Sequence, residues 1–122
     1  MAWIAPLLVG FVAFEHLGFL ILESFLWNTP TGHKVFGMAP AQAAATAALA
    51  QNQGLYNGFL AAGLIWGLIL QQQGAAHAGQ VQIFFLVCVV LAGIVGAATA
   101  SKSILFLQAF PAALALAAVL LR

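Results

Sequence analysis

Four long apolar stretches separated by short polar turns dominate the hydrophobic pattern of this chain. They cover about residues 3–27, 54–70, 81–100 and 104–121. At a rise of about 1.5 Å per residue, an apolar helix needs roughly 20 residues to cross the hydrocarbon core of a bilayer. The four stretches reach or approach that length. The pattern therefore predicts an all-α fold, an integral membrane four-helix bundle.

The polar segments between these stretches predict where the chain turns. Residues 28–32 combine Asn, Thr, Pro and Gly, which end helices. Residues 40–51 begin with a proline and are rich in alanine, so they favour a helix, but they are only weakly apolar. We expect a short interfacial helix there between the first and second spans, or an N-terminal extension of the second span. Residues 71–80 and 101–103 form the other two turns.

The composition indicates that lipid, rather than water, surrounds most of these helices. The 122 residues are 65% hydrophobic and 4% charged, whereas soluble domains carry roughly 25% charged residues. We therefore expect residues 1–122 to form a single transmembrane domain, multi-pass in the cell membrane of a bacterium, with the lipid bilayer as its main partner. The first stretch lacks the basic start of a cleavable signal peptide. A net charge of +1 gives no reason to expect nucleic acid binding, and the lone Cys88 forms no intramolecular disulfide.

The loops and the small residues bear on orientation and assembly. Lys34 and Lys102 fall in loops on the same side of a four-span bundle, so the positive-inside rule makes that side cytoplasmic and puts both termini outside. Small residues recur four apart, as at Gly54 and Gly58. This spacing allows close helix approach, which serves either packing within the bundle or a homodimer.

Both acidic residues of the chain lie in the first apolar stretch, Glu15 beside His16 and Glu23 further along. An ionisable side chain at the centre of a membrane costs about 2.5–3.5 kcal/mol on insertion scales, so such residues are functional candidates. Glu15 falls near the middle of the span. A helical turn of about 100° per residue places His16, Glu23 and Trp27 nearly on one line. We expect this face to point into the bundle.

Polar residues of the other spans gather towards the loops that carry the lysines. The predicted binding residues are Trp27, Gln53, Tyr56, Asn57, Lys102 and Gln108. We infer a polar recess open towards the lysine side, with Glu15 and His16 at its floor. Glu15, His16 and Glu23 are the residues assigned to catalysis or proton transfer.

Each of these residues also has a structural interpretation. Glu23 would be solvated or paired with Lys102 near the interface. Glu15 would be a neutral, hydrogen-bonded carboxyl, and His16 a neutral core histidine bonded to a backbone carbonyl. Tyr56 would be an interfacial anchor. The spacings typical of a helical metal site are absent, so the sequence predicts no metal and no cofactor.

Three segments carry a resemblance to a known family: Glu15-His16, the run from Glu23 to Trp27, and the run from Asn52 to Gly63. With these motifs, the sequence resembles the DUF1304 family, small four-span membrane proteins of bacteria and fungi. The resemblance extends over essentially the whole chain. It implies the four-span architecture and no established activity.

Three functions stay open. The architecture is similar to that of the small multidrug resistance transporters, in which a glutamate of the first span exchanges protons for a cationic substrate, although the motifs differ. The first hypothesis is therefore proton-coupled transport, or binding, of a small amphiphile or cation. The second is a membrane enzyme that uses Glu15, His16 and Glu23 for acid–base chemistry on a lipid-like substrate, as an isomerase does. The third is an accessory or binding subunit. The sequence favours the first.

Overall fold

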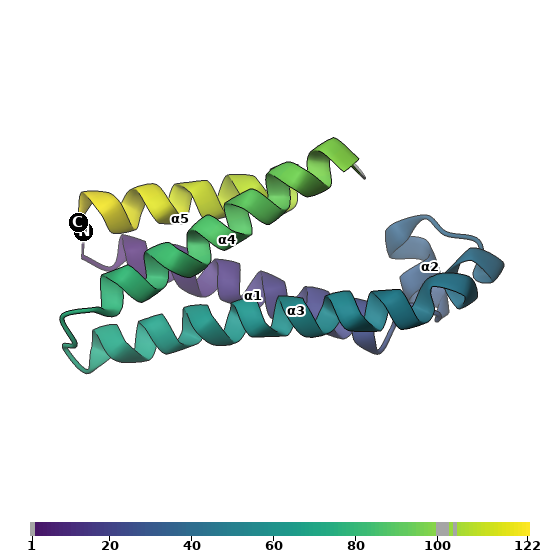
Figure 1. Ribbon diagram of the computed structural model, residues 1–122, viewed down its shortest axis with the longest axis horizontal. Coiled ribbons are helices and arrows are strands. Elements are labelled where there is room, and N and C mark those ends of the chain that lie inside the picture. Colours follow the sequence, from purple (N-terminus) through teal and green to yellow (C-terminus); the bar gives the residue numbers. More distant parts are fainter. Residues whose placement is uncertain (1, 100–102, 104) are drawn as a thin grey trace. The chain divides into compact units, whose positions relative to one another are not determined.

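The described part of the chain consists of helices joined by short turns, with no strand among its residues. The computed structural model describes residues 2–99, 103 and 105–122. Its elements are α1 (Ile4–Ser24), α2 (Pro30–Phe36), α3 (Pro40–Gln72), α4 (Ala78–Thr99), the π-helix η1 (Leu105–Ala109) and α5 (Phe110–Leu121), as shown in Figure 1. The expected all-α class is confirmed.

Three of these helices, α1, α3 and α4, are long and apolar enough to cross a membrane. A further apolar helix, Phe106–Leu121, is shorter than the length that a span requires. These lengths fit a membrane protein. A bundle of four complete spans stays a prediction.

Helix α3 begins earlier than the second span that the sequence predicts. Residues 40–51 are helical, but they do not form a separate interfacial helix, because α3 continues without a break over 33 residues to Gln72. The expected separate helix is therefore wrong, and the alternative, an N-terminal extension of the second span, describes the chain. Alanine, leucine and glutamine have high helix propensity, and isolated glycines cost only about 1 kcal/mol each. Nothing in this stretch is strong enough to end the helix.

The predicted turn after the first span contains a helix of its own. Helix α1 ends at Ser24, three residues before the expected boundary. Thr29 then caps α2, since its hydroxyl accepts a hydrogen bond from the Gly32 amide at 3.2 Å, and Pro30 takes the first helical position. Gly37 ends α2 with φ 63°, a left-handed conformation that suits glycine. Proline and threonine thus start a helix where the sequence analysis expected only a turn.

The contacts of the backbone divide the chain into two compact units. We call Met1–Phe14 together with Leu60–Arg122 the larger unit, and Glu15–Phe59 the smaller unit. Helices α1 and α3 each contribute to both.

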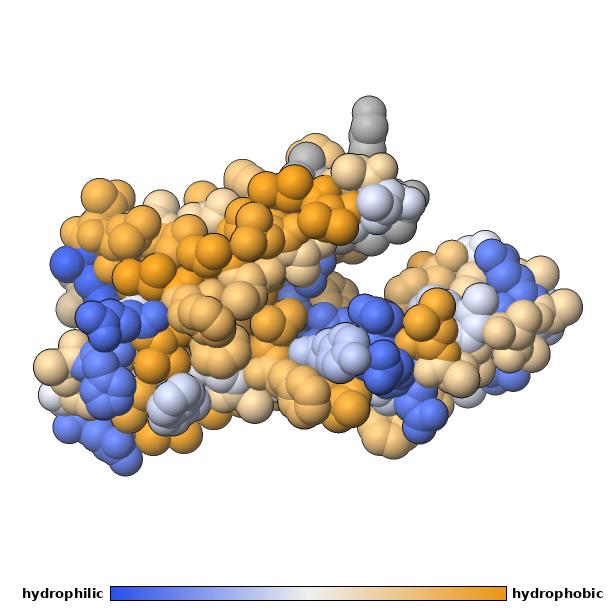
Figure 2. Space-filling model, viewed as in Figure 1, coloured by the Kyte–Doolittle hydropathy of each residue, from blue (hydrophilic) through white to orange (hydrophobic). Residues whose placement is uncertain are grey.

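The larger unit holds the apolar core. Its buried side chains come from α1, α3, α4 and α5 and are mostly small or β-branched: Ala5, Val9, Val12, Ala13, Leu64, Leu86, Val89, Ala112, Ala115 and Val119. Helix α4 packs along η1 and α5 (Figure 1). A Cβ atom added at Gly93 would lie 2.6 Å from the Ala109 Cβ, so glycine is needed for this close approach. Figure 2 shows apolar side chains over the outer surface of α4 and α5, as expected for a surface that faces lipid.

Glycines at the predicted four-residue spacing are used for packing within the chain. The Phe85 ring lies where a side chain at Gly63 would be, and Gln82 packs against Gly67. In the smaller unit, Gly58 lies against Leu20. The packing interpretation accounts for these positions, and a homodimer stays a prediction.

Candidate functional site

The smaller unit brings Glu23 and Asn57 together. Glu23 lies in the last turn of α1, and Asn57 lies near the middle of α3. The Asn57 amide donates a hydrogen bond to the Glu23 carboxylate through Nδ2 and Oε1. Both side chains are partly buried. An amide is neutral, so this bond orients the carboxylate without neutralising its charge.

Two further hydrogen bonds join α3 to the end of α1 and the turn after it. The Ser24 hydroxyl donates to the Gln51 carbonyl at 3.2 Å, and Gly54 lets the two helices approach there, because a Cβ atom at that position would collide with the Ser24 hydroxyl. The Trp27 indole Nε1 donates to the Thr46 hydroxyl at 3.0 Å. These bonds fix the spacing of the helices around Glu23.

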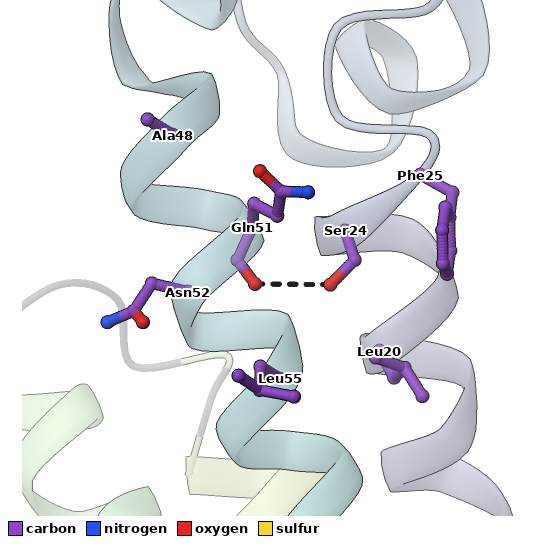
Figure 3. A pocket seen from close by; sticks show the side chains of 7 residues that line it. All are labelled: Leu20, Ser24, Phe25, Ala48, Gln51, Asn52 and Leu55. Carbon is purple, nitrogen blue, oxygen red and sulfur yellow. Dashed lines mark hydrogen bonds between the residues drawn. The ribbon is translucent and has the colours of Figure 1, made fainter.

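A groove of about 430 Å³ lies between these two helices. Its lining residues are Leu20, Ser24 and Phe25 from α1 and the residues just after it, and Ala48, Gln51, Asn52 and Leu55 from α3. Figure 3 shows Ser24 and Gln51 facing each other across the gap. The four α3 residues follow the spacing i, i+3, i+4 and i+7, which places them on one face of the helix.

A second groove of about 340 Å³ continues the first. It shares Ser24, Phe25, Ala48 and Gln51 with the first groove and adds Glu23, Trp27, Asn28, Thr29 and Ala47. We call the two together the α1–α3 groove. One wall therefore offers a carboxylate and aromatic rings, while the rest mixes apolar side chains with neutral hydrogen-bonding groups. This chemistry suits a small molecule that has both an apolar part and a positive charge.

Glu15 and His16 do not belong to the residues that line the α1–α3 groove. The Glu15 Oε1 atom is buried and has no hydrogen-bond partner among the described residues. His16 is completely buried, and its ring meets the edge of Phe19 at a centroid distance of 5.1 Å. Their expected place at the floor of a recess stays a prediction.

The remaining predicted residues have different surroundings. Tyr56 is 48% exposed and lies near the Phe59 ring, at a centroid distance of 6.2 Å, and Gln53 is exposed. Gln108 lies in η1, within the larger unit. Lys102 lies outside the described residues. Within the described ranges, no three His, Cys, Asp or Glu side chains group closely enough to hold a metal ion.

Comparison with known proteins places the chain in a family. A family model described as "Protein of unknown function (DUF1304)" matches residues 10–120. The chain belongs to the DUF1304 family. The expected resemblance is thus confirmed. An uncharacterized protein, YpaA, of Lactococcus lactis subsp. lactis (strain IL1403) is 30% identical over 109 residues, which cover 86% of this chain and 87% of the relative. No solved structure matches this DUF1304 protein.

Several groove residues of this DUF1304 protein are not among those predicted from the sequence. Ser24 is not among the predicted binding residues, and neither are Gln51 and Asn52, which lie at the boundary between residues 40–51 and the expected second span. A single helix across that boundary would have placed both on one face with Ala48 and Leu55. For a helix of this full length, the helical period alone is enough to predict that Gln51 and Asn52 share a face with Ala48 and Leu55.

Proposed function

We propose that this DUF1304 protein binds a small amphiphilic cation in the α1–α3 groove and exchanges it for a proton at Glu23, as a step in transport across the membrane. One observation carries the proposal. The Glu23 carboxylate lines the groove, and among the residues that the structure describes its hydrogen-bond donor is a neutral amide, Asn57. Its negative charge is therefore available to a positively charged ligand.

Aromatic rings support a cationic ligand. Phe25 lines both parts of the groove and is 71% exposed, so its face is accessible. Trp27 lines the part that holds Glu23, and its ring is held by Thr46 and by Phe36, whose centroid lies 4.6 Å away. A cation over an aromatic face gains about 0.5–1 kcal/mol at exposed sites and about 2 kcal/mol when desolvated.

Proton exchange follows from competition for one carboxylate. A proton and an organic cation neutralise the same charge, so a cation that binds to a protonated Glu23 displaces the proton. Glu15 lies eight residues earlier on α1, about 12 Å along the helix axis. Its Oε1 atom is buried and has no hydrogen-bond partner within the described ranges, which suits a second proton-holding position in the same span. The acid–base enzyme is less well supported, because neither Glu15 nor His16 lines the groove.

A matched pair of small ligands tests the binding step. Benzyltrimethylammonium carries an aromatic ring and a fixed positive charge, and benzyl alcohol has the same ring without the charge. For protein in lipid nanodiscs, we expect calorimetric titration to detect the cation and not the alcohol. Because a Glu23→Gln variant keeps the size and loses the charge, we expect it to bind the cation at least about tenfold more weakly, which corresponds to about 1.4 kcal/mol.

Two controls separate binding from proton transfer. Glu15→Gln removes the other acidic side chain, which does not line the groove, and we expect its affinity for the cation to stay within about twofold of wild type. A pH dye in weakly buffered solution reports the proton released on cation binding. Equal binding of the alcohol and the cation, or full affinity in Glu23→Gln, would remove Glu23 as the cation site. Binding without proton release would retain the site and refute the exchange.

A further inference from the structure

The larger unit contains a second polar cluster, around Gln82. Gln82 lies in the second turn of α4 and is completely buried. Its Nε2 atom donates to the Gly67 carbonyl at 3.0 Å and to Gln71 Oε1 at 2.8 Å. Its Oε1 atom accepts a hydrogen bond from Arg122 Nη2 at 2.8 Å. Arg122 Nη1 also donates to Gln71 Oε1 at 3.0 Å.

These hydrogen bonds hold the Arg122 guanidinium in place without neutralising it. Both acceptors are neutral amide oxygens, from Gln71 and Gln82. The two acidic residues of the chain, Glu15 and Glu23, belong to the smaller unit, so the larger unit contributes no carboxylate side chain. The two bonds use only part of the guanidinium's donors. The group therefore keeps its charge and has N–H groups left for an anion.

A mostly apolar groove adjoins this cluster through Gln71. It measures about 480 Å³ and is lined by Trp3, Pro6, Leu7, Leu68, Gln71 and Gln72. Gln71 belongs to both the groove wall and the Arg122 cluster. Trp3, at 61% exposure, has the position and chemistry of an aromatic residue at a membrane interface. Figure 2 shows polar residues gathered where α3 and α4 are joined, next to apolar surface.

We infer that this cluster and groove form a binding site for an anionic membrane phospholipid. The phosphate accepts hydrogen bonds from Arg122, and an acyl chain lies along Leu7 and Leu68. Charge complementarity selects this ligand, because a phosphate matches the planar fork of an arginine and an apolar groove next to it accepts a hydrocarbon chain. The site lies in the larger unit and is independent of the cation site proposed for Glu23.

A lipid titration of the purified full chain tests the site. Protein in a neutral detergent is titrated with phosphatidylglycerol or with phosphatidylcholine of the same acyl chains, and bound lipid is counted by native mass spectrometry. We expect phosphatidylglycerol to bind wild type about fivefold to tenfold more tightly than phosphatidylcholine, because one interfacial arginine is worth about 1 kcal/mol towards an anionic lipid. Soluble glycerol phosphate, which has the phosphate and no acyl chain, should not compete.

Three variants locate the effect. Arg122→Gln should abolish the preference for phosphatidylglycerol, and Arg122→Lys, which keeps the charge but not the fork, should retain part of it. Lys34→Gln removes the same charge from the smaller unit and should leave the preference unchanged. Equal binding of both lipids by wild type would overturn the inference whether or not the variants fold. An undiminished preference in Arg122→Gln, or competition by glycerol phosphate, would also overturn it.

Discussion

The buried amide of Gln82 offers the sharpest test of how the larger unit is held together. Replacement by methionine keeps the length of the side chain and removes its hydrogen bonds to Gly67, Gln71 and Arg122. The bond between Arg122 and Gln71 involves no atom of Gln82. The substitution therefore isolates what one buried amide contributes.

The expected loss of stability in Gln82→Met can be estimated from the hydrogen bonds that Gln82 makes. The two bonds to neutral oxygens are worth about 1 kcal/mol each, and the charge-assisted bond from Arg122 about 1.5–3 kcal/mol. Hydrogen bonds in membrane proteins average nearer 0.6 kcal/mol, because the unfolded chain in the membrane also finds partners. Methionine recovers roughly 1 kcal/mol through its more apolar side chain. We expect Gln82→Met to lower the free energy of unfolding by about 1.5–3 kcal/mol.

Reversible unfolding in mixed micelles of a neutral detergent and dodecyl sulfate, followed by circular dichroism, measures this free energy. Gln80→Met is the matched control, because Gln80 lies in the same helix and is exposed. Its change should stay within about 0.5 kcal/mol. A Gln82→Met variant as stable as this control would show that the buried amide contributes no net stability, which would refute the reasoning.

Two further changes test local packing and capping in the same assay. Gly93→Ala would place a methyl group 2.6 Å from the Ala109 Cβ, so we expect it to lower the free energy of unfolding by about 1–3 kcal/mol. In the control Gly18→Ala, nothing lies within 4 Å of the added atom, so we expect no loss of stability. Equal effects of the two variants would contradict the packing argument. Thr29→Ala removes the hydroxyl that caps the Gly32 amide, so we expect it to lower the free energy of unfolding by about 1 kcal/mol, and we expect Thr29→Ser to keep most of that stability. A Thr29→Ala variant as stable as wild type would show that the cap is unimportant.

The hydrophobic pattern predicted the helices better than their ends. The apolar stretches gave α1, α3 and α4 because burial in lipid selects for long runs without charge. The sequence left the continuity of α3 open between two alternatives, because hydropathy falls at residues 40–51 while helix propensity does not, and propensity decides where the backbone stays helical. The α2 helix was missed because Thr29 and Pro30 were read as residues that end a helix, although both also start one.

Part of the candidate site could also be predicted from the sequence. Glu23 and Asn57 were both named as candidate residues at similar depth on the first and second spans, because a charge in an apolar span needs polar surroundings, but their pairing is a finding of the structure. Gln82 was overlooked, although it interrupts an apolar helix near its start. Its partners, Gln71 and Arg122, are 11 and 40 residues away, and no local period relates them. Contacts at that separation depend on packing, which the sequence pattern does not encode.

The contacts within the larger unit differ from those within the smaller unit, and this difference bears on where a ligand can bind. Every side chain of the buried apolar cluster belongs to the larger unit. In the smaller unit, hydrogen bonds add to apolar contacts such as that of Trp27 with Phe36, and they run from Ser24 to Gln51, from Trp27 to Thr46 and from Asn57 to Glu23. Breaking an apolar core costs its full burial energy, whereas a hydrogen bond can be exchanged for one to water or to a ligand at little net cost. The α1–α3 groove therefore lies beside hydrogen bonds that a ligand can exchange, an arrangement that suits the reversible cation binding proposed above.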